Sequence, residues 1–398
     1  MKNINLQNYE VRTWLEIDTK KLRHNYLEFR RLIGKKCLLL AVVKSNAYGH
    51  GLVGYSEALD KIGVDWFGVD SFVEARKLRD AGIKKPILVL GYTLPSNFDD
   101  AAKLNVSLTV SSIEQVKTLT QILRLPLTAQ DDNEKKVKIH LKIDTGMHRQ
   151  GIQLDELPEA LKVLKSMKNI VVEGIYSHFA DVVPPKYLNA KIQLEKFEKA
   201  NQIIESACNP KSHLRGVIGG LIRHITATAG AIGMPESHFD MVRIGIGLMG
   251  LWPSDETRKA VEDYIRLEPI LSWKTVVSEI KSVKKYESVG YGFTAKLKRD
   301  SKLAILPIGY WHGFRRALSS KGEVLIRGVR CKVLGRVSMD MTTVDVTDLK
   351  SVDADDTVTL IGKDEDEEIA VEEMAELADS YTYEIITTIN PLIKKVYL

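Results

Sequence analysis

A lysine at the end of an apolar run is the first residue of this sequence whose position suggests chemistry. Residues 37–43 read CLLLAVV, Lys44 follows at once, and Tyr48, Gly49 and His50 come shortly after it. Shielding from water favours the neutral amine, and a neutral lysine is a nucleophile toward carbonyl groups. Most lysines at strand ends simply extend into solvent, so this position alone does not identify an active site.

Three later blocks also place polar groups at the ends of apolar runs. The first contains Lys142 and Arg149, the second contains His178, and the third contains Arg243 followed by the glycine-spaced residues 245–247. A planar guanidinium binds carboxylate or phenolate oxygens through paired hydrogen bonds. Glycines late in a barrel allow backbone N–H groups to approach a phosphate. Taken singly, each block is equally compatible with a loop, a structural histidine or a strand glycine.

The segments that must position these residues alternate between short apolar runs and amphipathic stretches. Near-continuous apolar runs separated by helical segments indicate parallel strands covered on both faces. Eight runs are enough to close a (β/α)8 barrel, although an open sheet of six to eight strands is compatible with the same count. The seventh run is the shortest and most polar. The runs are 37–43, 66–70, 86–91, 106–111, 137–143, 171–179, 224–228 and 241–249.

The pattern changes after about residue 265. Shorter runs with β-branched residues and glycine-containing turns predict an antiparallel sheet with one helix near 370–380. The sequence therefore predicts an α/β fold with an N-terminal (β/α)8 barrel over 13–265 and a mainly β domain over 266–398. Residues 1–12 are compatible with either domain, including pairing with the second. The predicted strands of the second domain are 270–280, 302–308, 323–327, 331–338, 341–346 and 357–361.

The composition is that of an ordinary globular protein. Hydrophobic residues make up 44%, charged residues 27%, and the net charge of +5 is spread along the chain without an arginine-rich stripe. The longest apolar run is too short to span a bilayer, and the N-terminus lacks a secretion signal. Three well-separated cysteines indicate neither disulfides nor a zinc site. We expect a cytoplasmic protein without a nucleic-acid, membrane or metal partner. The cysteines are Cys37, Cys208 and Cys331.

The segment AVVKSNAYGHG at 41–51 resembles the pyridoxal 5'-phosphate lysine motif of the alanine racemase family. Further matches recur in order from Trp14 to Ile393, including the KIDTGMHRQG block at 142–151. The resemblance implies a (β/α)8 barrel followed by a β-rich domain, with pyridoxal phosphate as the cofactor. It also implies interconversion of L- and D-alanine, which supplies D-alanine for bacterial peptidoglycan.

The resemblance also assigns roles to individual residues. Lys44 would carry the cofactor and act as one catalytic base, and Tyr291 would be the opposing base, reaching the barrel of the partner in a homodimer. Arg149 would bind the phenolic oxygen of the cofactor and the substrate carboxylate. Lys142 matches a lysine that the family often carries as a carbamate. The other cofactor-binding residues would be Tyr48, His178, Thr228, Arg243, Gly245 and Ile246, and the other substrate-binding residues Met339 and the gate residue Tyr310.

Arg243 distinguishes two reactions that the resemblance leaves open. It matches the residue that contacts the pyridine nitrogen of the cofactor, where decarboxylases with the same barrel carry an acid. A guanidinium does not give up its proton, so the ring nitrogen stays unprotonated and the cofactor is a weaker electron sink. Arg243 therefore favours racemisation.

Some positions depart from the family pattern, and they bear on the substrate. Ala227 stands where the family often has asparagine, and Pro391 where it has tyrosine. Trp311 and His312 also differ from the usual residues near the gate. A broader-specificity, serine or lysine racemase and a non-catalytic pyridoxal-phosphate protein stay open as alternatives. Without pyridoxal phosphate, the alternative is a metal-dependent barrel enzyme with ligands drawn from His50, His140, His148 and His178.

Overall fold

The computed structural model describes residues 11–122, 136–167, 169–182, 184, 187–207 and 220–398. These form two compact units. The larger unit comprises Lys21–Ala47 and Leu52–Glu268, and the smaller comprises residues 11–20 together with Tyr48–Gly51 and Pro269–Leu398. The predicted pairing of the N-terminal segment falls mostly on residues 1–10, which lie outside the described residues. The domain bounds 13–265 and 266–398 stay a prediction.

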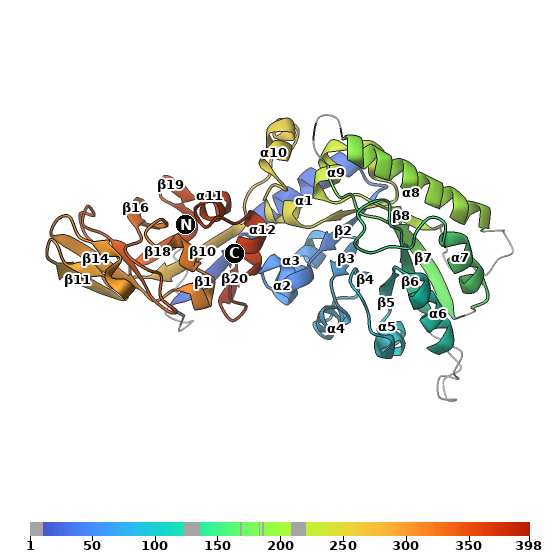
Figure 1. Cartoon of the computed structure of the whole chain (residues 1–398), viewed down its shortest axis with the longest axis horizontal. Coiled ribbons are helices and arrows are strands. Elements are labelled where there is room, and N and C mark those ends of the chain that lie inside the picture. The colour runs from blue at the N-terminus through green and yellow to red at the C-terminus, as the bar shows by residue number, and fades with distance from the viewer. Residues whose placement is uncertain (1–10, 123–135, 168, 183, 185–186, 208–219) are drawn as a thin grey trace. The chain divides into compact units, whose positions relative to one another are not determined.

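The larger unit contains an eight-stranded parallel sheet with the order β8-β7-β6-β5-β4-β3-β2-β9 (Figure 1). Backbone hydrogen bonds from Asp240 N to Arg223 O and from Arg243 N to Thr226 O, both 3.1 Å, join the β8 and β9 segments and close the ring. The predicted barrel is confirmed. Its strands are β2 (Leu38–Val42), β3 (Trp66–Val69), β4 (Ile87–Val89), β5 (Val106–Val110), β6 (Val137–Lys142), β7 (Ile170–Tyr176), β8 (Ile222–His224) and β9 (Met241–Ile244).

The seventh strand is the one whose predicted position was wrong. The sequence analysis placed it at 224–228, whereas β8 ends at His224 and Thr228 already begins α9 (Thr228–Gly233). In the eighth run, 241–249, only Met241–Ile244 form the strand β9, and a 3₁₀ turn over Ile246–Met249 follows it. Both predicted runs extend beyond the strand because the residues that follow it are themselves mostly buried.

Helices cover the outer face of the barrel (Figure 1). In α7 the buried residues Leu157, Ala160, Leu161 and Leu164 follow the i, i+3, i+4, i+7 spacing of an amphipathic helix. The helices are α1 (Thr19–Ile33), α3 (Leu52–Ile62), α4 (Phe72–Asp80), α5 (Phe98–Lys103), α6 (Ile113–Ile122), α7 (Leu157–Lys165), α8 (Leu188–Ala207), α9 and α10 (Asp255–Val261).

The smaller unit is mainly β, as predicted, and its largest sheet has the order β16-β15-β18-β10-β1-β20, with β19 paired to β18. The strand β1 (Thr13–Ile17) was not identified from the sequence; it pairs antiparallel with β10 and parallel with β20. The sheet is therefore antiparallel, as expected, except for the parallel pair of β1 with β20. The strands are β10 (Leu271–Val276), β15 (Glu323–Ile326), β16 (Val329–Lys332), β18 (Thr357–Asp364), β19 (Glu367–Ile369) and β20 (Lys394–Tyr397).

Two smaller sheets and two helices complete this unit. One sheet has the order β11-β14-β17, and the other pairs β12 with β13. Two helices replace the single one expected near 370–380, because a turn at residues 378–381 separates them. The elements are β11 (Glu279–Val283), β12 (Ser288–Val289), β13 (Ala295–Lys296), β14 (Ser301–Leu306), β17 (Thr342–Asp345), α11 (Val371–Leu377) and α12 (Thr382–Thr387).

Candidate active site

Lys44 lies just beyond the carboxyl end of β2, the end of a parallel barrel at which active sites are built. Its Nζ is 3.9 Å from Oδ1 of Asp70, which follows β3, and the two side chains are 38% and 58% exposed. Both side chains are thus partly open to solvent in the single chain. The ammonium is accessible to a reactant and is close to one carboxylate.

The chain leaves Lys44 through a left-handed turn. Residues 45–48 all have positive φ angles, between 51° and 58°. Asn46 supports the turn, because its backbone N–H donates to Glu74 (3.1 Å) and its side-chain oxygen accepts from the N–H of Leu52 (2.9 Å). A left-handed helical conformation costs about 1–2 kcal/mol per residue, and such strain is concentrated at functional sites. No motif in the sequence indicated this turn.

Lys142 is the last residue of β6 and is almost completely buried. Its Nζ donates to Oε1 of Gln150 (3.0 Å) and lies 5.5 Å from the centre of the Tyr176 ring. Burial, together with the positive charges of neighbouring residues, lowers the pKa of Lys142 to about 8. Those charges belong to Arg149, Arg243 and Lys44. Lys142 and these three predicted site residues therefore form one strongly cationic region, which favours an anionic ligand.

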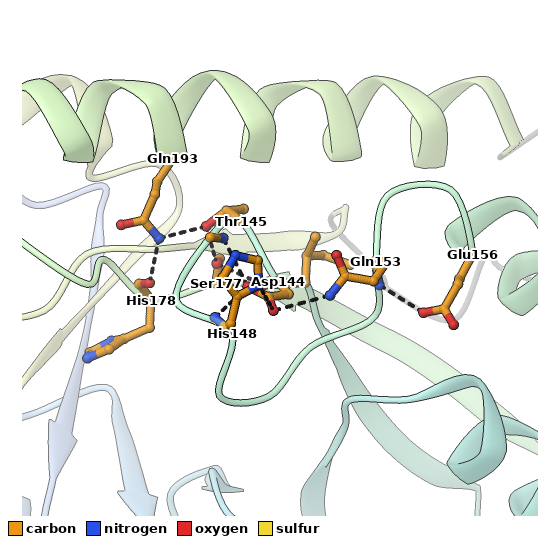
Figure 2. A network of polar contacts seen from close by, with 10 residues as sticks. Asp144, Thr145, His148, Gln153, Glu156, Ser177, His178 and Gln193 are labelled. Carbon is orange, nitrogen blue, oxygen red and sulfur yellow. Dashed lines mark hydrogen bonds and ion pairs between the residues drawn. The ribbon is translucent and has the colours of Figure 1, made fainter.

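The loop that carries Arg149 is organised by Asp144 (Figure 2). Its Oδ1 accepts from the backbone N–H groups of Gly146 (2.9 Å) and His148 (3.1 Å), and its Oδ2 accepts from Gln153 (3.2 Å). Burial raises the pKa of Asp144, but these hydrogen bonds outweigh it and the net pKa is lower than usual. An ionised Asp144 therefore fixes the loop around the exposed Arg149.

Gln193 of α8 joins this loop to the one after β7. Its Nε2 donates to Thr145 Oγ1 (3.0 Å) and to the carbonyl of His178 (3.1 Å), and its Oε1 accepts from Ala180 N (2.8 Å). Figure 2 shows the amide between the two loops, with the His178 ring directed away from it. Gln193 thus holds the backbone of two predicted site segments. Gln193 was not predicted from the sequence, because a glutamine on an amphipathic helix carries no local signal.

Arg243 is buried, at 3% exposure, and donates only to neutral acceptors. Its guanidinium contacts Nδ1 of His178 (3.0 Å) and Nδ1 of His224 (2.8 Å), and it donates to the carbonyls of Ser177 and Ile225 (2.8 Å each). Since arginine has only donors, both Nδ1 atoms accept and both imidazoles carry their proton on Nε2. Burial and the Arg243 charge lower the pKa of His178 and of His224 well below the usual value, so both rings are neutral.

The residues predicted to bind phosphate lie around two short helical turns. Thr228 begins α9 and Ile246 begins the turn after Gly245, and neither turn has a side-chain cap on its first N–H groups. The two turns are close, because a Cβ added to Gly247 would lie 2.7 Å from Cγ2 of Thr228. Uncapped N–H groups at such turns suit a phosphate. Together with Lys44 and the cationic region, these groups fit pyridoxal phosphate.

The remaining predicted site residues belong to the smaller unit. Tyr291, Tyr310 and Met339 are exposed there, at 71%, 43% and 55%. Gly290 and Gly292 flank Tyr291 with φ angles of 77° and 69°, which favour glycine.

Tyr48 packs in the same unit against Tyr383, with ring centres 6.1 Å apart, and burial raises the pKa of the Tyr48 phenol above its usual value. Asn390, beside the unusual Pro391, donates to the carbonyl of Trp311 (3.0 Å) and thus supports the segment that carries Tyr310.

The described residues contain no cluster of three or more His, Cys, Asp or Glu side chains arranged to hold a metal ion. The histidines considered as metal ligands therefore do not converge. Along the described part of the chain, none of the helices combines the length and apolar character needed to cross a bilayer.

The parallel barrel, the lysine after its first strand and the mainly β unit are the architecture expected of a barrel-type racemase. The family model for the N-terminal domain of alanine racemase matches residues 17–253, and that for the C-terminal domain matches 270–397. The chain belongs to the alanine racemase family, whose members typically depend on pyridoxal phosphate.

Relatives and solved structures agree with this assignment. An alanine racemase of Methanococcus maripaludis is 37% identical over 97% of this chain and 98% of its own. The Bacillus anthracis alanine racemase, solved with bound L-Ala-P, superposes with a TM-score of 0.87 at 33% identity, covering 97% of this chain and 95% of that one. The histidine racemase of Leuconostoc mesenteroides has a TM-score of 0.82 at 26% identity, covering 98% of both chains. The fold is thus shared by racemases of different substrates.

Proposed function

We propose that this protein interconverts L- and D-alanine with pyridoxal phosphate, and that it supplies D-alanine for the bacterial cell wall. The buried Arg243, held between neutral histidines, is the observation that carries the proposal. A permanent cation at the position predicted to face the cofactor's ring nitrogen favours racemisation over reactions that need a strong electron sink. The alanine racemases among the relatives support alanine as the substrate.

The cofactor would be bound by Lys44, by the N–H groups at Gly245 and Ile246, and by Thr228 and Tyr48. When bound, pyridoxal phosphate acidifies the Cα–H of an attached amino acid. Arg149 and the backbone N–H of Met339 would hold the substrate carboxylate, because a guanidinium and an amide both donate to carboxylate oxygens. Tyr310 would limit access to the site.

Two bases would move the proton at Cα. Lys44 Nζ would act on one face and Tyr291 Oη, contributed by the partner of a homodimer, on the other. His178 carries its proton on Nε2 because Arg243 occupies Nδ1, so its outward N–H is available to donate to a phenolate. Such donation would favour the ionised form of Tyr291. The exposure of Tyr291 on its own unit supports a role on a partner subunit.

Racemisation of a panel of amino acids tests the proposed function. We expect interconversion of L- and D-alanine, followed by circular dichroism with added pyridoxal phosphate, with kcat/KM for serine, lysine and histidine at least about tenfold lower, a difference of about 1.4 kcal/mol. Equal rates would instead support a broad-specificity racemase, which Ala227, Pro391 and the histidine racemase neighbour favour as the second candidate. Absence of conversion with every amino acid would refute both.

Lys142 is proposed to be carbamylated. The neutral Nζ attacks the carbon of CO₂, an N–C bond forms, and the proton leaves to solvent, so that a cation becomes an anion beside Arg149 and Arg243. Because the folded-state pKa is lowered to about 8, the reactive neutral amine becomes predominant as the pH rises through that value. We expect a carbamate carbon signal with ¹³C-bicarbonate that grows over this pH range and is lost in Lys142→Met.

A second lysine provides the control for this experiment. Burial also lowers the pKa of Lys395 to about 8, and its Nζ donates to the carbonyl of Pro391 (2.7 Å). Lys395→Met should leave the signal unchanged. A signal that survives in Lys142→Met but disappears in Lys395→Met would contradict the assignment.

A further inference from the structure

A line of polar side chains continues from Arg243 into the barrel interior. Arg243 contacts Nδ1 of His224 (2.8 Å), and Nε2 of His224 contacts Nδ1 of His140 (2.9 Å). Nε2 of His140 then lies 3.4 Å from Oε2 of Glu173, the longest of the three links. We call these four residues the histidine chain. His140 and His224 have no measurable exposure, so their polar groups depend on partners within the protein.

The direction of every proton in the histidine chain follows from its first member. Arg243 can only donate, so Nδ1 of His224 accepts and its proton is on Nε2. That proton is donated to Nδ1 of His140, so the proton of His140 lies on Nε2, which is 3.4 Å from Oε2 of Glu173 without completing a hydrogen bond to it. A second proton on His140 would set two donors against each other. The geometry thus requires two neutral imidazoles of the same tautomer.

Glu173 supplies the negative charge at the far end. Burial raises the pKa of its carboxyl, but the contacts with His140, Ser107 and Lys138 more than offset this, and the net pKa is lower than usual. Ser107 Oγ donates to Oε2, and Lys138 Nζ lies 3.5 Å from Oε1. Among the described residues, no carboxylate lies within ion-pair distance of Arg243, so an effect of Glu173 on that cation has to pass through the two imidazoles.

The backbone makes space for the histidine chain. A Cβ on Gly174 would lie 2.4 Å from Nδ1 of His140, which no side chain could tolerate without displacing the ring. The pairing of β6 with β7 also shifts register between Ile139 and His140. The edge of Trp66 packs on His140, and Tyr176 stacks on His224 with ring centres 4.8 Å apart. These contacts fix both imidazoles in one orientation.

We propose that Glu173 is a positioning residue that acts through His140 and His224 to orient the Arg243 guanidinium. The carboxylate polarises the two imidazoles in series, so His224 becomes a stronger acceptor for Arg243. A carboxylate placed directly beside Arg243 would instead occupy the guanidinium N–H groups that would contact the cofactor. The kinetic part of this proposal rests on the proposed function, whereas the tautomer part does not.

Long-range ¹H–¹⁵N spectra of the histidine side chains in the full-length dimer test the proposal without any assay of activity. We expect each of His140 and His224 in the unmutated protein to carry a single ring proton, on Nε2. In Glu173→Gln the Nε2–H resonance of His140 should move upfield, and that of His224 should move less. Finding either ring protonated, or with its proton on Nδ1, in the unmutated protein would overturn the proposal even if no variant folds.

Kinetics provide the second readout. Replacing a residue that hydrogen-bonds the outer nitrogen of a metal-bound histidine typically lowers activity by about tenfold or more. By the same logic we expect Glu173→Gln to lower kcat for alanine by about tenfold. KM should change less than about twofold, because Glu173 does not touch substrate. Glu173→Asp should recover part of the loss.

Lys138→Gln is the matched control, since it removes another contact of Glu173 but leaves the histidine chain intact. We expect it to change neither the histidine spectra nor kcat. Displaced histidine signals with unchanged kcat in Glu173→Gln would refute the positioning role. Inactivity of the unmutated protein toward every amino acid would instead refute the proposed function.

Discussion

Replacing Lys44 with alanine is expected to remove both the covalent attachment of pyridoxal phosphate and the racemase activity. Lys44 is the lysine at the cationic end of the barrel that is accessible to a reactant, with 38% exposure of its side chain. A positioned acid or base contributes about 10²–10⁴-fold, so loss of Lys44 as a base together with its cofactor attachment should lower kcat/KM by at least about 10³-fold. Borohydride reduction followed by peptide mass spectrometry should locate the cofactor on Lys44 in the unmutated protein and nowhere in the variant.

Lys85 offers a control for this experiment. It precedes β4, at the amino end of the barrel strands, and its Nζ is 3.7 Å from Asp60. Lys85→Ala should retain the cofactor adduct and the activity. Small amines added to Lys44→Ala should restore part of the activity, which separates loss of a base from misfolding. An adduct that persists on another lysine in Lys44→Ala would refute the assignment.

Replacing Tyr291 with phenylalanine should have the second-largest effect. Only the phenolic oxygen is lost, so we expect kcat/KM to fall by about 10²–10⁴-fold while pyridoxal phosphate stays attached. Tyr286→Phe is the matched control, because Tyr286 is also exposed in the smaller unit (65%) and has no proposed catalytic role. Retention of activity within about twofold in Tyr291→Phe would exclude it as a base.

The same variant tests whether the site is shared between subunits. A hybrid dimer of one Lys44→Ala subunit and one Tyr291→Phe subunit has one site with both defects and one site with neither. Random assortment of equal amounts should therefore restore about a quarter of the unmutated activity, by the symmetry of a two-fold dimer. Co-expression with two affinity tags isolates the hybrid. An inactive hybrid would show that Lys44 and Tyr291 do not act across the subunits.

The strands of the barrel were predictable because their signal is local. A strand buried on both faces of a parallel barrel is apolar along its length, so six of the eight runs match the observed strands closely and the eighth begins with β9. The seventh run was misplaced because β8 is only three residues long and largely polar, whereas the segment after it is also mostly buried. β1 was missed for a different reason: its partners β10 and β20 are more than 250 residues away, and only the folded sheet brings them together.

The candidate site likewise has features that follow from local sequence and features that depend on distant contacts. By itself the sequence determined the family, the fold class and the residue types available for chemistry, because motifs such as 41–51 and 142–151 are contiguous. The tertiary structure decided the exposure, the pKa values and the alignment of these side chains, which the local sequence patterns do not contain. It placed Lys44 in a partly exposed position before a left-handed turn, and it lowered the pKa of Lys142 through burial and the charges of Arg149, Arg243 and Lys44. It also aligned His140 with His224 opposite Gly174. The physical reason is that hydrogen-bond direction, burial and electrostatic potential depend on atoms from several strands, and no single stretch of sequence contains them.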